Sequence, residues 1–363
     1  MPTTSAAIRE LADYCEMAVR HSYDQYERDG TLHAKAAKTF QDDDIWNHKW
    51  VPDDFDVCDG ASHPVWQAFS PTQKLAWNHL LWALDYSSVA QGERQIIVLN
   101  NFAGKEYAHV LPSVVELERR ASFEETDHNE AFAIGLEGVR ARYFKNRKEP
   151  LWSDSASGFQ NPLLNKVSRH AMGIVANRLM GPNFPTLFFL ARGMKTHGFK
   201  PFENAIFTND EAPEGIRQIA RLHRLDESRH MATSLHLARL SNEVLDTLPR
   251  DNRFIMKAAI QAAFPHGRSA DYRLTYWKRV FAESTIYADI PRRDLDALYA
   301  HMEQRIEANL ASLHERQARL TRQANKRIIE ECGLSNDMKR LFVEVMRKDP
   351  AYAATVDAVV IDN

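Results

Sequence analysis

The sequence of 363 residues predicts an all-α fold, a four-helix bundle surrounded by peripheral helices. Apolar residues recur at helical spacing along several long stretches, strand signals are weak throughout, and two Glu-x-x-His motifs lie within such stretches. The hydrophobic content of 44% and the charged content of 26% are ordinary for a globular protein. No linker divides the chain, so we expect a single domain over residues 1–363, with the core at about 71–248 and peripheral helices at 1–28 and 250–348.

The individual elements follow from local signals, taken in chain order. A first peripheral helix is expected from about Thr4 to Arg28, and the Asp-rich residues 29–69 are expected to be irregular. Ser70 is a good N-cap, followed by proline in the first turn and Gln73 at the capping-box position, so the second helix begins there and should end near residues 100–104. The other helices are expected at residues 105–147 (one or two helices), 161–180, 186–207, 213–248, 252–263, 272–287, 292–332 (with interruptions) and 337–347.

Three ionisable residues lie on the apolar face of the helix expected at 213–248. At ~100° per residue, His223, Glu227 and His230 fall within an arc of about 60°. The same stripe carries Ile219 and Leu237, which indicates that it is the buried face. Burying such groups without partners costs several kcal/mol each, and a metal cation is the simplest compensating charge.

A second, similar set of residues lies upstream. Glu125 and His128 repeat the i, i+3 spacing of Glu227 and His230, and ferritin-like bundles use two such pairs plus single carboxylates to bind two metals. Glu93 supplies a single carboxylate on an apolar seam, 32 residues before Glu125. That interval allows one helix to end, turn and place the next one antiparallel beside it. The sequence therefore predicts a ferritin-like metal site where these three helices meet.

The remaining helix of the bundle offers two candidate ligands. His197 precedes Glu227 by 30 residues, close to the 32 that separate the first pair, whereas Glu203 precedes it by 24. Spacing favours His197, and the usual carboxylate chemistry favours Glu203. Pro201 removes a backbone hydrogen bond, so we expect a kink beside whichever residue is the ligand.

Three acidic residues adjoin the expected ligands. Glu124 and Asp127 flank the ligands Glu125 and His128 but face elsewhere on the helix, which indicates surface or supporting groups. Asp226, directly before Glu227, is placed to accept a hydrogen bond from a ligand histidine.

Together these residues resemble the ligand set of the non-haem di-iron arylamine oxygenases of the p-aminobenzoate N-oxygenase (AurF) family. The additional histidine, His223, one turn before the second Glu-x-x-His motif, is the specific feature, and the similarity covers roughly residues 40–245. The family has a glutamate where gapless spacing places His197, so either Glu203 takes that role or the site has a fourth histidine. The ligand set predicted on this basis is Glu93, Glu125, His128, His197, His223, Glu227 and His230.

The resemblance implies an O2-activating di-iron oxygenase that N-oxygenates an amine of a small metabolite through a peroxo-level oxidant. It would use two iron ions as cofactor and O2 as co-substrate. No flavin or nicotinamide motif is evident, so we expect electrons from a separate reductase or ferredoxin. C-hydroxylation or desaturation and a ferritin-like metal store are the alternatives, and ligand type alone does not separate iron from manganese.

Charge and composition narrow the functional classes further. The net charge of −3 argues against a general nucleic-acid binder, and no apolar run approaches the ~18 residues that cross a bilayer. The three cysteines, Cys15, Cys58 and Cys332, have neither metal-like nor disulfide-like spacing, which favours a reducing cytoplasm. Helical enzymes of this kind often form dimers, so we include a homodimer among the expectations.

Overall fold

The computed structural model confirms the all-α prediction. It describes residues 3–148, 180, 183–245, 253–263, 268–349, 352–357, 359 and 361, and across these residues the regular structure is helical, without strands. The helix expected at 161–180 lies outside the described residues except for Met180. The division into a single domain stays a prediction.

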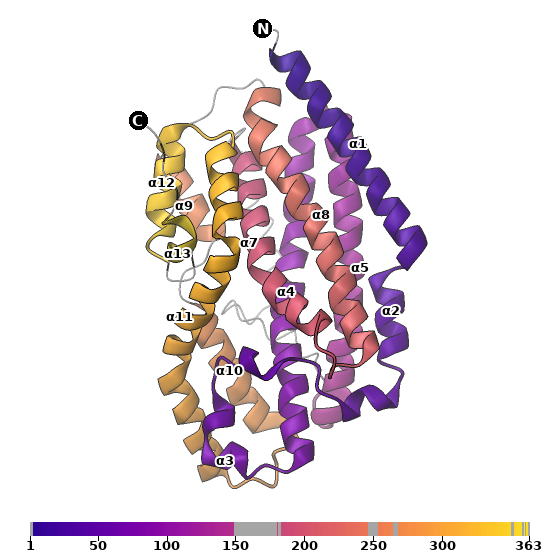
Figure 1. Cartoon of the computed structure of the whole chain (residues 1–363), viewed down its shortest axis with the longest axis vertical. Helices are drawn as coiled ribbons and strands as arrows, with labels where there is room; N and C mark the ends of the chain where they lie inside the picture. Colours follow the sequence, from indigo (N-terminus) through magenta and orange to yellow (C-terminus); the bar gives the residue numbers. More distant parts are fainter. Residues whose placement is uncertain are drawn as a thin grey trace.

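Four long helices run side by side along the long axis of the molecule (Figure 1). They are α4 (Pro71–Tyr107), α5 (Pro112–Tyr143), α7 (Asn183–Phe207) and α8 (Glu214–Val244). The chain packs α4 against α5 and α7 against α8, each pair joined by a short connection. Pro201 lies inside α7, so this helix continues past the residue that the sequence marks as a kink.

The start of α4 follows the predicted capping box. Ser70 Oγ accepts the Gln73 backbone N–H at 3.3 Å, and Gln73 Oε1 accepts the Ser70 backbone N–H at 2.9 Å. These two bonds satisfy donors that the first turn of a helix otherwise leaves free. The helix ends at Tyr107, a few residues beyond the expected end at 100–104.

Residues 29–69 are more regular than expected. A helix, α2 (Leu32–Thr39), follows α1 (Thr3–Asp29), and both pack on α5 and α8. The Asp127 carboxylate of α5 accepts the backbone N–H groups of Leu32 and His33 at 2.7 and 3.2 Å. This tertiary contact caps α2, and sequence periodicity does not reveal it. Only short helical segments follow, namely η1 (Asp43–Asn47), η2 (Asp53–Phe55), η3 (Gly60–Ser62) and α3 (Pro64–Gln67).

The C-terminal part forms a second layer beside the bundle (Figure 1). Its elements are α9 (Arg253–Ala263), α10 (Arg268–Glu283), α11 (Arg292–Glu331), α12 (Asn336–Met346) and α13 (Ala353–Val356). The interruptions expected between residues 292 and 332 are wrong, because α11 is one continuous helix. The reason is local, since no glycine or proline occurs between Arg292 and Glu331.

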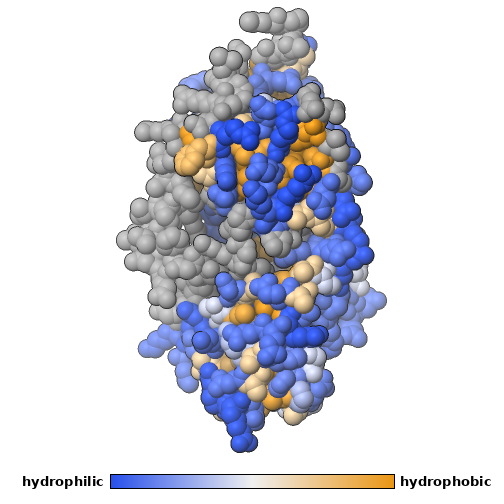
Figure 2. All heavy atoms as spheres, turned by 90° about the vertical axis from the view of Figure 1, so that its left-hand side faces the viewer, coloured by the Kyte–Doolittle hydropathy of each residue, from blue (hydrophilic) through white to orange (hydrophobic). Residues whose placement is uncertain are grey.

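The surface agrees with the composition. Among the coloured atoms of the face in Figure 2, hydrophilic ones predominate, and hydrophobic atoms gather between them, most extensively in the upper half. None of the described helices combines the length and the apolar composition that crossing a membrane requires. The three cysteines are buried as free thiols.

Candidate metal centre

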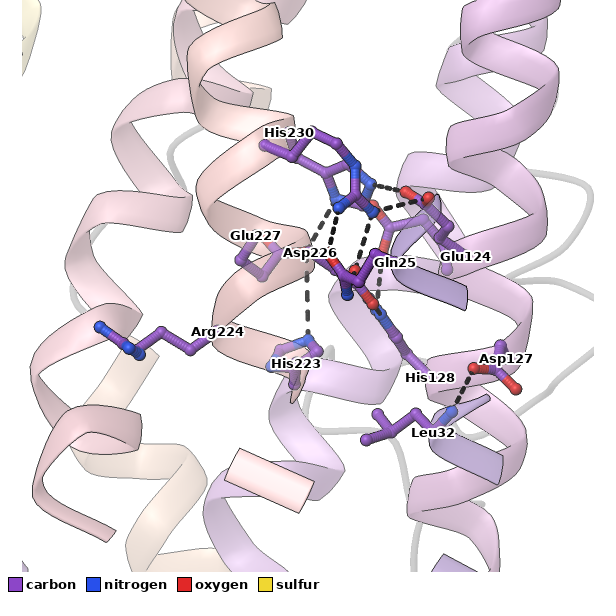
Figure 3. Close-up of polar contacts among 12 residues, drawn as sticks. Gln25, Leu32, Glu124, Asp127, His128, His223, Arg224, Asp226, Glu227 and His230 are labelled. Atoms are coloured by element: carbon purple, nitrogen blue, oxygen red, sulfur yellow. Dashed lines mark hydrogen bonds and ion pairs between the residues drawn. The ribbon is translucent and has the colours of Figure 1, made fainter. Parts of the chain in front are cut away.

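Six of the predicted ligands meet in the interior of the bundle. His223, Glu227 and His230 of α8 face Glu125 and His128 of α5 and Glu93 of α4, and all six side chains are buried. Figure 3 shows His223 and His230 turned toward the α5 side chains, whereas Arg224 of the same helix points away from them. The helical arc inferred from sequence spacing is therefore the face that α8 turns to its neighbours.

These side chains form two groups that share one residue. Ligand atoms within 4.8 Å of one another come from Glu93, His128, His223 and Glu227 in the first group, and from Glu125, Glu227 and His230 in the second. In the first group His223 Nε2 lies 2.7 Å from Glu93 Oε1, and in the second His230 Nδ1 lies 2.9 Å from Glu227 Oε1. A carboxylate common to both groups is suited to bridge two cations.

Two buried atoms of these ligand groups have no hydrogen-bond partner among the residues that the structure describes. They are Glu125 Oε2 and His128 Nδ1, which lie 3.6 Å apart. A lone pair buried without a donor costs free energy, and a metal ion is a partner that satisfies both atoms. Mixed carboxylate and imidazole ligation is a donor set that iron and manganese accept. The residues present therefore fit a dinuclear centre of such metals.

Each imidazole of the cluster also meets a carboxylate through its other ring nitrogen. His128 Nε2 lies 2.9 Å from Asp226 Oδ2, which confirms the contact expected from the sequence for Asp226. His230 Nε2 lies 2.6 Å from Glu124 Oε2. His223 Nδ1 contacts Glu203. Such pairs fix the tautomer and the orientation of a ligand histidine and increase its basicity.

Helix α7 carries the two remaining candidate ligands, Glu203 and His197. Glu203 is fully buried and contacts His223, and its second oxygen, Oε2, has no partner within the described part of the chain. It belongs to neither of the two groups of potential ligands. His197 lies in α7, but its side chain is outside the described residues, so its role as a ligand stays a prediction.

Two residues that the sequence analysis did not select complete the surroundings. Arg192 of α7 is buried, and its Nη2 donates to Glu125 Oε1 at 2.8 Å. Thr196 Oγ1 donates to Glu227 Oε2 at 2.9 Å. A usable signal existed for Arg192, because a single arginine interrupts the apolar run from Phe188 to Met194.

Negative charge exceeds positive charge around the cluster. The carboxylates that contact the three imidazoles are those of Glu93, Glu124, Glu125, Glu203, Asp226 and Glu227. The arginines that contact these carboxylates are Arg120, Arg192 and Arg229. Among the described residues, six carboxylates against three guanidinium groups leave an excess that bound cations would neutralise, and buried charge of this kind is otherwise costly.

In the absence of metal, this excess holds protons on the imidazoles. Burial opposes the charge on His223, but Glu203 and Glu93 raise its pKa to about 10. The pKa of His230 is likewise well above its usual range, because Glu125, Glu227 and Glu124 outweigh burial. Since a metal needs neutral imidazole, an entering cation must displace these protons.

Comparison with known proteins gives a match to a family model over part of the chain. Residues 19–135 match the family model of the acyl halogenase CylC-like proteins, a segment that contains Glu93, Glu125 and His128. No curated protein and no solved structure matches the chain. The match names acyl halogenases rather than arylamine N-oxygenases, so it does not support N-oxygenation. Together with the buried His/Glu cluster, this similarity to acyl halogenase CylC-like proteins suggests a di-iron oxygenase-type enzyme.

Proposed function

We propose that the chain is an O2-dependent di-iron enzyme that oxidises an aliphatic carbon of an acyl substrate, by halogenation or hydroxylation. The observation that carries this proposal is the pair of buried ligand groups that share Glu227. Glu93, His128, His223 and Glu227 would hold one iron, and Glu125, Glu227 and His230 the other. Two iron ions at these positions would supply the electrons with which O2 is reduced.

The protein's own residues orient and shield such a centre. Asp226, Glu124 and Glu203 each hold one imidazole in a fixed orientation. Arg192 donates to Glu125, and the hydrogen bond limits the positions that this carboxylate can take. The burial of the whole cluster excludes bulk water, which would otherwise quench a reactive oxidant.

Aromatic side chains beside the first ligand group support an apolar substrate. The Phe132 ring lies 5.0 Å from the His223 ring between centroids, and the Phe199 ring lies 6.3 Å from it. Phe202 packs on Phe199 at 5.2 Å. Apolar and aromatic surroundings suit an aliphatic chain better than a charged substrate. The name of the matched family supports the same substrate class.

N-oxygenation of an amine is the second candidate. It is favoured by His223, the residue that marks the resemblance to the p-aminobenzoate N-oxygenase family, because His223 lies within the first ligand group. Both proposed reactions need an external electron donor for every turnover after the first, because two iron(II) ions supply only two electrons. A separate reductase or ferredoxin is the proposed donor.

Product analysis tests the proposal. The protein is loaded with iron(II) without air, then supplied with 18O2, a chemical reductant, and either a fatty acyl thioester with bromide or p-aminobenzoate. A brominated acyl product, or one carrying a single 18O atom, supports oxidation at carbon, whereas an 18O-labelled nitroso or nitro product favours the amine reaction. The control is Glu227→Gln, which removes the shared carboxylate. Uptake of many irons per chain, or O2 consumption no faster than in this control, contradicts the enzyme and favours a metal store.

A further inference from the structure

Four oxidisable aromatic side chains form a continuous row that starts beside the candidate metal centre. Adjacent ring centroids lie 4.6 Å apart between Tyr86 and Trp82, 5.4 Å between Trp82 and Trp50, and 4.8 Å between Trp50 and Trp46. These separations mean contact between neighbouring rings. The row links α4 of the bundle core to the segment that precedes it, so it is a product of tertiary packing.

The inner end of the row reaches the ligand groups. Tyr86 is fully buried, and its ring centroid lies 6.4 Å from that of His223. Its hydroxyl donates a long hydrogen bond, 3.5 Å, to Glu203 Oε1. The same oxygen contacts His223 Nδ1, so one carboxylate connects Tyr86 to a potential metal ligand.

The outer end of the row lies just beneath the surface. Trp46 is 6% exposed and lies in η1, where Asp43, Asp44 and Asn47 are exposed. Trp50 and Trp82, by contrast, are at most 1% exposed. Trp50 Nε1 donates to the Ile45 carbonyl at 2.9 Å, and an acceptor at this nitrogen stabilises the ring when it loses an electron.

We propose that Tyr86, Trp82, Trp50 and Trp46 carry oxidising equivalents from the metal centre to Trp46, beneath the exposed residues of η1, when the centre is oxidised without a substrate. The inference rests on the proposed O2-dependent function. Tyrosine and tryptophan are the side chains that give up one electron most readily, apart from cysteine thiolate and methionine. Phenylalanine does not give up an electron readily. Phe132 is therefore not part of the row, although its ring centroid lies 4.6 Å from that of Tyr86, as close as that of Trp82.

The transfer balances as a one-electron step. Tyr86 gives one electron to the oxidised centre and its phenolic proton to Glu203 Oε1. Trp82, Trp50 and Trp46 then give up one electron in turn, each to its inner neighbour, and the proton returns to Tyr86. The electron missing at Trp46 comes from a one-electron reductant in solution, such as ascorbate, and without one the ring reacts with water and O2.

If the four rings of the row only stabilise the core, the expected results differ. Buried aromatic rings also stabilise a core by packing, and a tryptophan replaced by phenylalanine keeps a ring but loses its ready oxidation. Trp77 is the matched control, since it is a buried tryptophan of α4 that stacks on Trp277 at 3.8 Å, a ring outside the row. Trp77→Phe should therefore reproduce the packing loss without interrupting the row.

The test exposes iron(II)-loaded protein to O2 without substrate and locates oxidised residues by peptide mass spectrometry. In wild type we expect oxidation to collect at Trp46 and to fall when ascorbate is added. In Trp50→Phe, oxidation of Trp46 should fall at least five-fold and oxidation of Trp82 or Tyr86 should rise, whereas Trp77→Phe should match wild type. Iron content and thermal midpoint are measured on each variant. If Trp50→Phe does not load iron, Trp46→Phe replaces it, with oxidation then expected at Trp50.

The outcomes separate the two proposals. If wild type consumes O2 but Trp46 is oxidised equally in Trp50→Phe and wild type, or is not oxidised in either, the row has no such role and the enzyme proposal stands. If wild type binds no iron or consumes no O2, the proposed function falls and this inference falls with it.

Discussion

At the scale of single residues, Asp226 joins three parts of the structure through one carboxylate. Its Oδ2 accepts from His128 Nε2, and its Oδ1 accepts from Gln25 Nε2 at 2.6 Å and from Arg229 Nη2 at 2.8 Å. The histidine is thereby held with Nδ1 toward Glu93 and Glu125. A change that keeps the size of this side chain but removes its charge isolates that role.

Asp226→Asn should weaken metal binding by about 10–100-fold, because the amide no longer increases the basicity of His128 or fixes its tautomer. A competition titration with a coloured iron(II) chelator measures the affinity, and Glu130→Gln, an exposed change on α5, is the control. Equal affinity in Asp226→Asn and wild type would show that the contact is not needed for metal binding.

His79 gives a pH prediction away from the metal centre. Its Nδ1 lies 2.6 Å from the Tyr143 hydroxyl and its Nε2 lies 2.8 Å from the His48 carbonyl, so the buried ring is neutral and satisfied. Burial lowers its pKa to about 3. In the unfolded chain the ring takes up a proton below pH ~6.5, which the folded protein does not. The free energy of unfolding should therefore fall as the pH drops from 6.5, by about 2 kcal/mol at pH 5.

Urea unfolding of wild type and His79→Gln at pH 7.5 and pH 5 measures this contribution. The difference between the two proteins should shrink, or change sign, at the lower pH, because glutamine does not titrate. A difference that stays constant between the two pH values would contradict a neutral buried His79.

The sequence predicted most clearly the residues whose spacing within one helix defines their role. Glu125 with His128, and Glu227 with His230, are recognisable because three residues of helix place both side chains on one face. Glu124 was assigned to surface or supporting groups without a choice between them, and the structure shows it buried against His230 and Arg229, which come from another helix. Such contacts depend on how the helices pack, and the spacing within one helix does not contain that information.

At the scale of elements, α1 does more than cover the bundle. Ser22, Gln25 and Tyr26 recur at helical spacing along it, and they bond to Glu124, Asp226 and Asp127 respectively. From the sequence, only a peripheral helix was expected at the position of α1. The polar face of α1 was not recognised, because polar residues on a helix usually face water. The eight-residue α2 was missed for a related reason, since so short a helix is marginal unless other parts of the fold stabilise it.

Two glycines in the bundle make a matched test of helix packing. A Cβ atom at Gly135 of α5 would lie 2.5 Å from Trp82 Cη2 and 2.7 Å from Phe40 Cζ, whereas one at Gly92 of α4 would meet nothing within 4 Å. Gly135→Ala should therefore destabilise the protein by about 1–3 kcal/mol through overpacking. Gly92→Ala should stabilise it by about 0.5–1 kcal/mol, because alanine is the better helix former.

Chemical denaturation of both variants against wild type gives the two free-energy differences. Shifts in the same direction for both would mean that α4 and α5 are not in the close contact described at Gly135.

At the scale of the whole molecule, helical periodicity was sufficient for the fold class, and motif spacing was sufficient to bring three helices together. Which α7 residue completes the site was not predictable. Pro201 lies between His197 and Glu203 inside one continuous helix, so counting residues does not say which of the two faces the cluster. The aromatic surroundings of His223 were not predictable either, because Phe132 of α5 and Phe199 of α7 come from different elements and no linear motif records them.

The central claim is that two metal ions are held together by a shared carboxylate. It is tested most directly by elemental analysis of iron per chain after anaerobic iron(II) loading and desalting, on wild type, Glu227→Gln and Glu243→Gln. Glu243 is an exposed residue of the same helix and undergoes the same change of charge. We predict about two irons per chain in wild type and in Glu243→Gln, and fewer than about one in Glu227→Gln, because both ligand groups lose a member. Wild type without stoichiometric iron, or Glu227→Gln that still holds two, would contradict the account.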